Sequence, residues 1–252
     1  MSAKKETLGK TVGVVVAVCL VCSIVVSSAA VGLRTLQQAN AAIDKQSNIV
    51  QAAGLADAAA GDISGTFEKY IEERFINLET GKYVDEPKEG YNMYKEAKNP
   101  KFSVAVTNSN VGFKQRASIA NLYLVRNDEG EVTRLILPVH GNGLWGLMYG
   151  LLAIDADGNT VRELVYYQHK ETPGLGAEIQ NPSWKAKWNG KKLFNNGEVA
   201  IEVNKGDNSS NQYAVDALSG ATLTSNGVQN TLAYWAGKNG FGPYLKKQTW
   251  KS

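Results

Sequence analysis

The feature that most constrains the fold is an apolar run near the N-terminus. From Thr11 to Leu33 the chain carries no charged residue, and most positions are Val, Ala, Leu, Ile or Cys. As an α-helix this run would extend about 34 Å, which is enough to cross a hydrocarbon core of about 30 Å. We therefore expect residues 11–33 to be a single transmembrane helix, with a short tail of residues 1–10 before it.

The charges on either side of the run predict its orientation. Lys4, Lys5 and Lys10 precede it against a single Glu6, whereas only Arg34 follows it closely. Positive residues favour the cytoplasmic side of a span. The tail is therefore expected in the cytoplasm and the main domain in the periplasm, held at a bacterial inner membrane.

A cleaved signal peptide is the competing interpretation of the apolar run. Ser27–Ala29 resembles a small-residue cleavage site. The run is longer than the usual core of a signal peptide, which favours a retained anchor. Under either interpretation the large domain is exported.

Both cysteines, Cys19 and Cys22, lie inside the apolar run. They could supply half of a four-cysteine metal site, but burying thiolates in lipid is costly, so packing as small apolar residues is favoured. The exported part has no cysteine and therefore no disulfide. The chain has only two histidines, without the spacing of metal ligands, so no metal site is expected.

The exported part is expected to be an α+β domain built around an antiparallel sheet. Residues 34–62 are predicted to be a helical stalk, interrupted near Gly54, and residues 63–252 the folded domain. The net charge of +3 is weak and scattered, so nucleic-acid binding is not expected. Hydrophobic periodicity and turn residues predict helices over 67–78 and 182–188, and strands over 119–126, 132–139, 151–155, 161–169, 199–203 and 213–218. The first two strands flank the turn residues Asn127–Gly130 and the next two flank Ala156–Asn159, so two hairpins are predicted.

A run of small residues near the C-terminus ends on a threonine. In the stretch Asp216–Thr222, the residues Ser219, Gly220 and Ala221 add little bulk. A phosphorylated chain attached to the Thr222 hydroxyl could therefore lie close to the backbone. The alternative is that the cluster is an ordinary cap of the helix that follows.

That helix is predicted over Asn226–Ala236, with Thr224 or Ser225 as its N-cap. The first turn of a helix has unpaired N–H groups and the positive end of the helix dipole. A phosphate on Thr222 would face this end of the helix.

Two further loops have the composition of a ligand site. His140–Gly146 is rich in glycine and contains Leu144 and Trp145, which could lie against a flat ring; the alternative is a turn whose tryptophan belongs to the core. His169–Gly176 combines charged and hydroxyl groups with a Pro-Gly turn and a leucine, and so offers both apolar walls and polar partners. His169 could be a base, although a lone histidine beside a strand is more often structural. No Rossmann or P-loop fingerprint is present.

The span and the three motifs Gly141–Gly146, Glu171–Gly176 and Ser219–Thr222 together resemble the covalent-FMN subunits of respiratory membrane complexes. The resemblance covers nearly the whole chain. It is strongest to the family of C subunits of the sodium-translocating NADH:quinone oxidoreductases, particularly over Leu144–Gly150 and Ala217–Gln229. The same motif occurs in the G subunit of the Rnf electron-transport complex, which stays open as an alternative.

The resemblance implies that a separate flavin transferase joins FMN through its phosphate to Thr222, with Asp216 serving that reaction more than electron transfer. The finished chain would relay electrons between other subunits of a complex that couples NADH oxidation by quinone to sodium export. No catalytic residue, NADH site or quinone site is expected on it. Candidate FMN-binding residues are Thr222, Asp216, Ser219, Gly220, Ala221, Thr172, Leu175, Gly176, Glu171, Lys170, Leu144, Trp145 and Gly143.

Within this set, Thr172 is expected to bond the polar edge of the flavin and Leu175 to cover one face of its ring. Lys170 would favour the anionic reduced ring or simply be solvated. A third possibility, of another class, is a flavin-free membrane-anchored domain that binds a partner.

Overall fold

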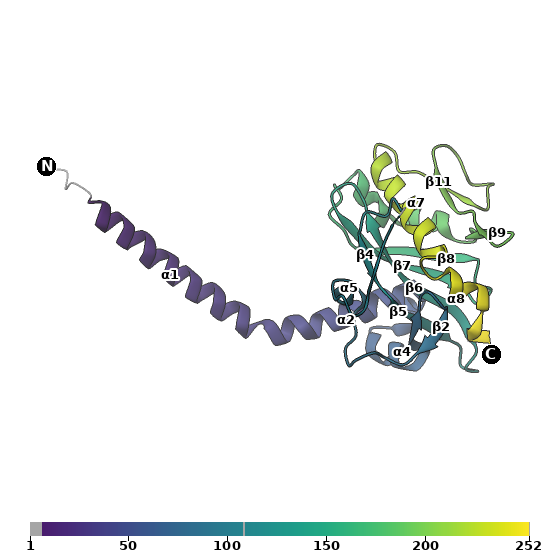
Figure 1. Ribbon diagram of the computed structural model, residues 1–252, viewed down its shortest axis with the longest axis horizontal. Coiled ribbons are helices and arrows are strands. Elements are labelled where there is room, and N and C mark those ends of the chain that lie inside the picture. Colours follow the sequence, from purple (N-terminus) through teal and green to yellow (C-terminus); the bar gives the residue numbers. More distant parts are fainter. Residues whose placement is uncertain (1–6, 108, 252) are drawn as a thin grey trace. The chain divides into compact units, whose positions relative to one another are not determined.

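A computed structural model describes residues 7–107 and 109–251 of the chain (Figure 1). The described chain divides into two compact units, with the division between Lys45 and Gln46. Lys4, Lys5 and Glu6, on which the expected orientation partly depends, lie outside the described residues.

The first unit contains helix α1 (Leu8–Gly32) and the first part of α2 (Arg34–Ala52). Every residue of α1 is exposed, and its 25 residues, with a mean hydropathy of 2.8, are long and apolar enough to cross a membrane. A helix that is apolar on all sides has no solvent-facing stripe, as expected of one surrounded by lipid. The helix begins three positions before the predicted start at Thr11, so it includes Lys10.

Within the described residues of the second unit, six strands form one antiparallel sheet in the order β2-β1-β5-β6-β7-β8. Both predicted hairpins are confirmed, because β5 pairs with β6 and β7 pairs with β8. The strands are β1 (Ile71–Asn77), β2 (Lys82–Val84), β5 (Ile119–Arg126), β6 (Val132–Asn142), β7 (Leu147–Asp155) and β8 (Val161–Gln168).

Shorter elements surround this sheet. Further strand segments are β3 (Ser103–Ala105), β4 (Gln115–Ala117), β9 (Phe194–Asn195), β10 (Glu198–Val199), β11 (Glu202–Asn204) and β12 (Ala214–Asp216). The helices are α3 (Ala56–Ala59), α4 (Ile63–Tyr70), α5 (Met93–Glu96), α6 (Pro182–Lys185), α7 (Thr222–Ala236) and α8 (Gly242–Lys247), with 3₁₀ turns η1 (Gly176–Gln180), η2 (Ala186–Trp188) and η3 (Thr249–Lys251).

The helix predicted over 67–78 is wrong. Only its first four residues belong to α4, and the chain changes to strand β1 at Ile71, which pairs with β5 from Ile71–Val125 to Asn77–Ile119. Ile71 and Ile76 are both buried, in different core clusters. Tertiary pairing with a neighbouring strand thus outweighs the local periodicity.

Other predicted elements are shorter than expected. The helix predicted from Pro182 is a single α turn, α6, continued by the 3₁₀ turn η2. The strands predicted over 199–203 and 213–218 contract to β10, β11 and β12, and β11 pairs with β12 in parallel, outside the main sheet.

The sheet is covered on both faces. Strand side chains alternate between faces, so Leu135 and Leu137 of β6 join one apolar cluster, to which α7 contributes Leu232 and Trp235. Ile136 joins the cluster on the opposite face, beneath the end of α2. Helix α7 lies across the sheet (Figure 1), and this packing brings its N-terminus beside the ends of β6 and β8.

The end of α2 is held to the sheet by Arg134 of β6. Gly54 takes a φ of +70° just after the helix, which confirms the predicted interruption there. The Arg134 Nη1 donates to the carbonyls of Ala53 at 2.5 Å and Ala52 at 3.4 Å. Burial lowers the pKa of this guanidinium. Arg134 therefore satisfies carbonyls that a helix end leaves without partners.

We expect Arg134→Met to lower the free energy of unfolding by about 1–3 kcal/mol, because it leaves buried carbonyls unpaired while keeping an apolar stem. Urea unfolding of the full chain in detergent, followed by tryptophan fluorescence, measures the change. Arg162→Met is the matched control, since it removes an exposed ion pair with Asp155 worth about 0–1 kcal/mol. Equal losses in the two variants would contradict the anchoring role.

Candidate functional site

Three segments that are far apart in the sequence line one small cavity of about 220 Å³. They are the turn between β6 and β7, the loop after β8, and the start of α7. The lining residues are Leu144, Trp145, Glu171, Thr172, Leu175, Gly176, Gly220, Ala221, Thr222, Leu223 and Thr224. All three sequence motifs thus contribute to one place.

Thr222 is the first residue of α7, and its side chain is exposed at this cavity. Among the described residues, its hydroxyl has no hydrogen-bond partner, and the preceding Ala221 provides no side-chain cap. The N–H groups of Thr222, Leu223 and Thr224 likewise have no acceptor within the described chain. The start of α7 is therefore a free hydroxyl beside uncapped donors, a combination that suits a phosphate.

The prediction of Thr224 or Ser225 as the N-cap is wrong, because the helix already begins at Thr222. Both side chains are buried and bonded elsewhere. Ser225 Oγ accepts from the N–H of Leu218 at 3.0 Å and donates to the carbonyl of Ala221 at 3.1 Å. Ser225 thus closes the turn that carries the small-residue motif, and Gly220 completes it with a φ of +71°.

Glu171 joins the three segments. Its side chain is buried, with 5% of its surface exposed. Oε1 accepts from the backbone N–H of Trp145 at 3.0 Å, and Oε2 accepts from Thr224 Oγ1 at 2.5 Å. The Glu171 N–H donates to Nδ1 of His169 at 3.1 Å, so the histidine supports the loop and does not line the cavity.

The rim of the cavity is apolar and exposed. Leu144, Trp145, Leu175 and Leu223 are 49%, 63%, 45% and 58% exposed. In the described part of the second unit, Val104 is the one other large apolar side chain exposed to this degree. Trp145 is therefore not part of the core, and a concentrated exposed apolar patch marks a binding surface. Leu223 lines the cavity but is absent from the residues predicted from the sequence. The one signal for it in the sequence is its position directly after Thr222.

Asp216 lies outside the cavity lining and is bound to other parts of the chain. Its Oδ2 pairs with Lys187 Nζ at 2.5 Å, and its Oδ1 accepts from the N–H of Asn208 at 2.7 Å. These contacts, with Lys187 contributing most, lower the pKa of Asp216. The backbone carbonyl of Asp216 also accepts from Trp184 Nε1 at 2.8 Å. Asp216 therefore fixes the start of the motif from outside the site.

Three more predicted residues do not line the cavity. Ser219 and Lys170 are exposed beside it. Gly143 packs behind it, where an added Cβ would lie 2.5 Å from Glu171 Oε1. The glycine is thus required by a neighbouring side chain of the same protein.

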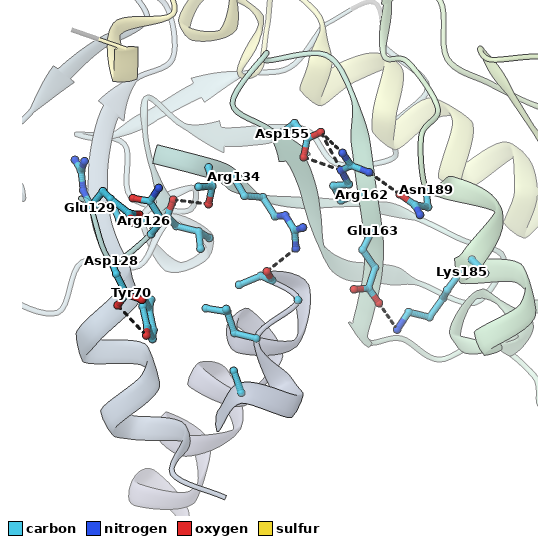
Figure 2. Close-up of a pocket in the computed structure, with 18 of the residues that line it drawn as sticks. Tyr70, Arg126, Asp128, Glu129, Arg134, Asp155, Arg162, Glu163, Lys185 and Asn189 are labelled. Atoms are coloured by element: carbon cyan, nitrogen blue, oxygen red, sulfur yellow. Dashed lines mark hydrogen bonds and ion pairs between the residues drawn. The ribbon is translucent and has the colours of Figure 1, made fainter. Parts of the chain in front are cut away.

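A larger groove of about 940 Å³ lies on the other side of the sheet, between the end of α2, the β5–β6 turn and α6 (Figure 2). Charged groups dominate it, and most are paired: Arg162 with Asp155 at 2.6 Å and Lys185 with Glu163 at 2.7 Å. Within the described chain, the larger groove has no rim of exposed large apolar side chains against which a flat ring could lie. The smaller cavity is therefore the better candidate site, although its volume is smaller.

Comparison with known proteins finds a matching domain family and several similar proteins. A family model described as "FMN-binding domain" matches residues 143–237, which span all three cavity segments. The chain is 48% identical over 251 residues to the C subunit of Na(+)-translocating NADH-quinone reductase from Vibrio anguillarum (98% of this chain, 97% of the relative). It is 46% identical over 248 residues to the C subunit of the reductase from Yersinia pestis (96% and 93%).

Solved structures are also similar. The crystal structure of Shewanella oneidensis NqrC matches with a TM-score of 0.76 and 32% identity, over 81% of this chain and 95% of that one. The crystal structure of the C subunit of Na(+)-translocating NADH-quinone reductase from Parabacteroides distasonis matches with a TM-score of 0.66 and 28% identity, over 86% and 97%. The likeness therefore extends to most of the fold as well as the sequence.

Proposed function

The chain belongs to the family formed by the C subunits of Na(+)-translocating NADH-quinone reductases, and on that premise we propose that it carries FMN covalently on Thr222 and relays electrons between other subunits. As a member of this family it is part of an oxidoreductase and has an FMN-binding domain. The observation that carries the finer proposal is the Thr222 hydroxyl at the uncapped start of α7, which is exposed and has no partner among the described residues.

The described residues fit both ends of the cofactor. The phosphate would be held by the Thr222 oxygen and the free N–H groups of the first turn of α7, whose dipole favours negative charge. The ring would lie against the exposed apolar side chains Leu144, Trp145, Leu175 and Leu223. The Thr172 side chain, also exposed at the cavity, can donate a hydrogen bond to a polar edge of the ring.

The size of the cavity suits a relay. At about 220 Å³ it is smaller than the roughly 300–1,000 Å³ of pockets that enclose a ligand fully. Part of the flavin would remain accessible to a redox partner. Bound FMN supplies one-electron chemistry, while the protein holds the ring and keeps it from being lost.

The same proposal includes the placement of the chain at the membrane and the enzyme that attaches the flavin. The helix α1 fits an anchor in the inner membrane. We place its N-terminus in the cytoplasm and the second unit in the periplasm, on the basis of the flanking charges. A separate flavin transferase would reach Thr222 because its hydroxyl is exposed, and Asp216 would present the motif to that enzyme through the turn it fixes.

Similarity to the C subunits over nearly the full chain favours the sodium-pump complex over the Rnf complex. The match to an FMN-binding domain favours both of these over a flavin-free anchor.

We expect the mature full-length chain to have the mass of its sequence plus one FMN less one water. Mass spectrometry of the protein purified from cells that contain the flavin transferase measures this, and protein from cells without the transferase is the control. A fluorescent band on a denaturing gel should accompany the heavier species. An unmodified mass in the presence of the transferase would contradict the covalent attachment.

A further inference from the structure

We propose that Glu171 is a positioning residue that locks the three cavity segments together, and that its negative charge lowers the reduction potential of the bound flavin. The effect of the charge on the potential rests on the proposed function. The locking of the three segments concerns the protein alone and can be tested without flavin.

Packing of α7 on β6 already brings these segments together, and the hydrogen bonds of Glu171 add a direct link between them at the cavity itself. One carboxylate oxygen holds the backbone of the β6–β7 turn at Trp145, and the other holds the first turn of α7 at Thr224. Thr224 lies two residues after Thr222. The carboxylate thereby fixes the attachment point relative to Trp145 and Leu175, the side chains against which the ring would lie.

Two glycines show how closely the chain is built around this carboxylate. An added Cβ at Gly143 would lie 2.5 Å from Oε1, and one at Gly176 would lie 2.5 Å from Oε2. Either substitution would displace the carboxylate. The glycines of two different motifs thus share one structural cause, which the sequence alone does not reveal.

The Glu171 carboxylate has no cationic side chain as a partner among the described residues. Both oxygens act as acceptors, as expected of an ionised carboxylate. Among the described residues, no lysine or arginine forms an ion pair with it, and it lines the cavity while being 95% buried. A buried charge is poorly screened by solvent. Adding an electron to a ring in this cavity is therefore opposed, which lowers its potential.

Two substitutions separate the two roles. Glu171→Gln keeps the shape: its amide oxygen can accept from Trp145 and its NH₂ can donate to the Thr224 oxygen, so the bridge persists without the charge. Glu171→Asp keeps the charge but is one methylene shorter, so it cannot span both partners. Glu178→Gln is the control, because it removes a carboxylate on the neighbouring η1 that does not line the cavity.

The positioning role is tested on the full-length chain made without the flavin transferase. Hydrogen–deuterium exchange of the peptide containing Trp145 should rise at least tenfold in Glu171→Asp and stay near the parent rate in Glu171→Gln and Glu178→Gln. Unchanged exchange in Glu171→Asp would overturn the locking role, whatever the chain does with flavin.

The charge role is tested on the flavin-loaded chain by redox titration with dithionite as the electron donor. Glu171→Gln should raise the midpoint potential by at least the equivalent of a tenfold change in the oxidised-to-reduced ratio, about 59 mV for a one-electron couple. Glu178→Gln should leave it unchanged. A flavin that is attached but unshifted in Glu171→Gln overturns the tuning role, whereas a parent chain without flavin overturns the proposed function instead.

Discussion

Thr222→Ala should yield a folded protein that carries no covalent flavin at all. The side chain is exposed at the start of α7 and has no partner among the described residues, so its loss should change the free energy of unfolding by no more than about 0.5 kcal/mol. The alanine has no oxygen to bond phosphorus. In-gel flavin fluorescence and intact mass, each with the transferase present, measure the result.

The matched control for this experiment is Thr224→Val. Thr224 is the other threonine of α7 that lines the cavity, but it is only 1% exposed and its hydroxyl is bonded to Glu171. A transferase cannot reach that oxygen without opening the first turn of α7. We therefore expect Thr224→Val to retain the covalent flavin. Fluorescence that persists in Thr222→Ala and disappears in Thr224→Val would move the attachment to Thr224.

The parts of the fold that sequence predicts well are those set by short-range chemistry. The β5–β6 hairpin surrounds Asn127–Gly130, whose turn residues and flanking apolar alternation need no distant partner to be recognised. The end of α2 at Gly54 is equally local, because a glycine at positive φ ends the helix.

The sequence-based predictions fail where contacts with residues far away in the chain determine the local structure. Residues 71–77 have a pattern that fits a helix, but β5 offers them a full set of strand hydrogen bonds. Glycine and other small residues in the motifs indicate that another group approaches the backbone closely, but they do not identify that group. At Gly143 the group is the Glu171 side chain. The sequence motifs predict the residues that face the cavity better than those that support it, such as Asp216. The supporting contacts join segments far apart in the chain, and a local pattern does not reveal them.

The stability of the domain should fall as the pH is lowered because of His140. This residue of β6 is 5% exposed and lies between the rings of Phe113, at 4.4 Å, and Tyr149, at 5.7 Å. Its Nδ1 has no hydrogen-bond partner among the described residues. Burial lowers the pKa of His140 to about 3, whereas an unfolded histidine has a pKa of about 6.5.

The sign of the effect follows from these two values. Above a pH of about 6.5 the imidazole is neutral in both states and costs nothing. Below it, the unfolded chain binds a proton that the folded chain excludes, so the free energy of unfolding decreases until the pH reaches the folded pKa of about 3. The contribution of this one group between pH 7 and pH 5 is about 2 kcal/mol.

His140→Phe isolates that contribution, because a phenyl ring preserves the stacking between Phe113 and Tyr149 but cannot be protonated. Trp235 Nε1 donates to the backbone carbonyl of residue 140, at 2.7 Å, and this bond survives the substitution. Urea unfolding at pH 7 and pH 5 should show a parent protein that loses about 2 kcal/mol more than the variant. Carboxylates titrate in both proteins and cancel in the difference. Parallel losses in the two proteins would mean that water or a rearrangement lets His140 be protonated inside the folded domain.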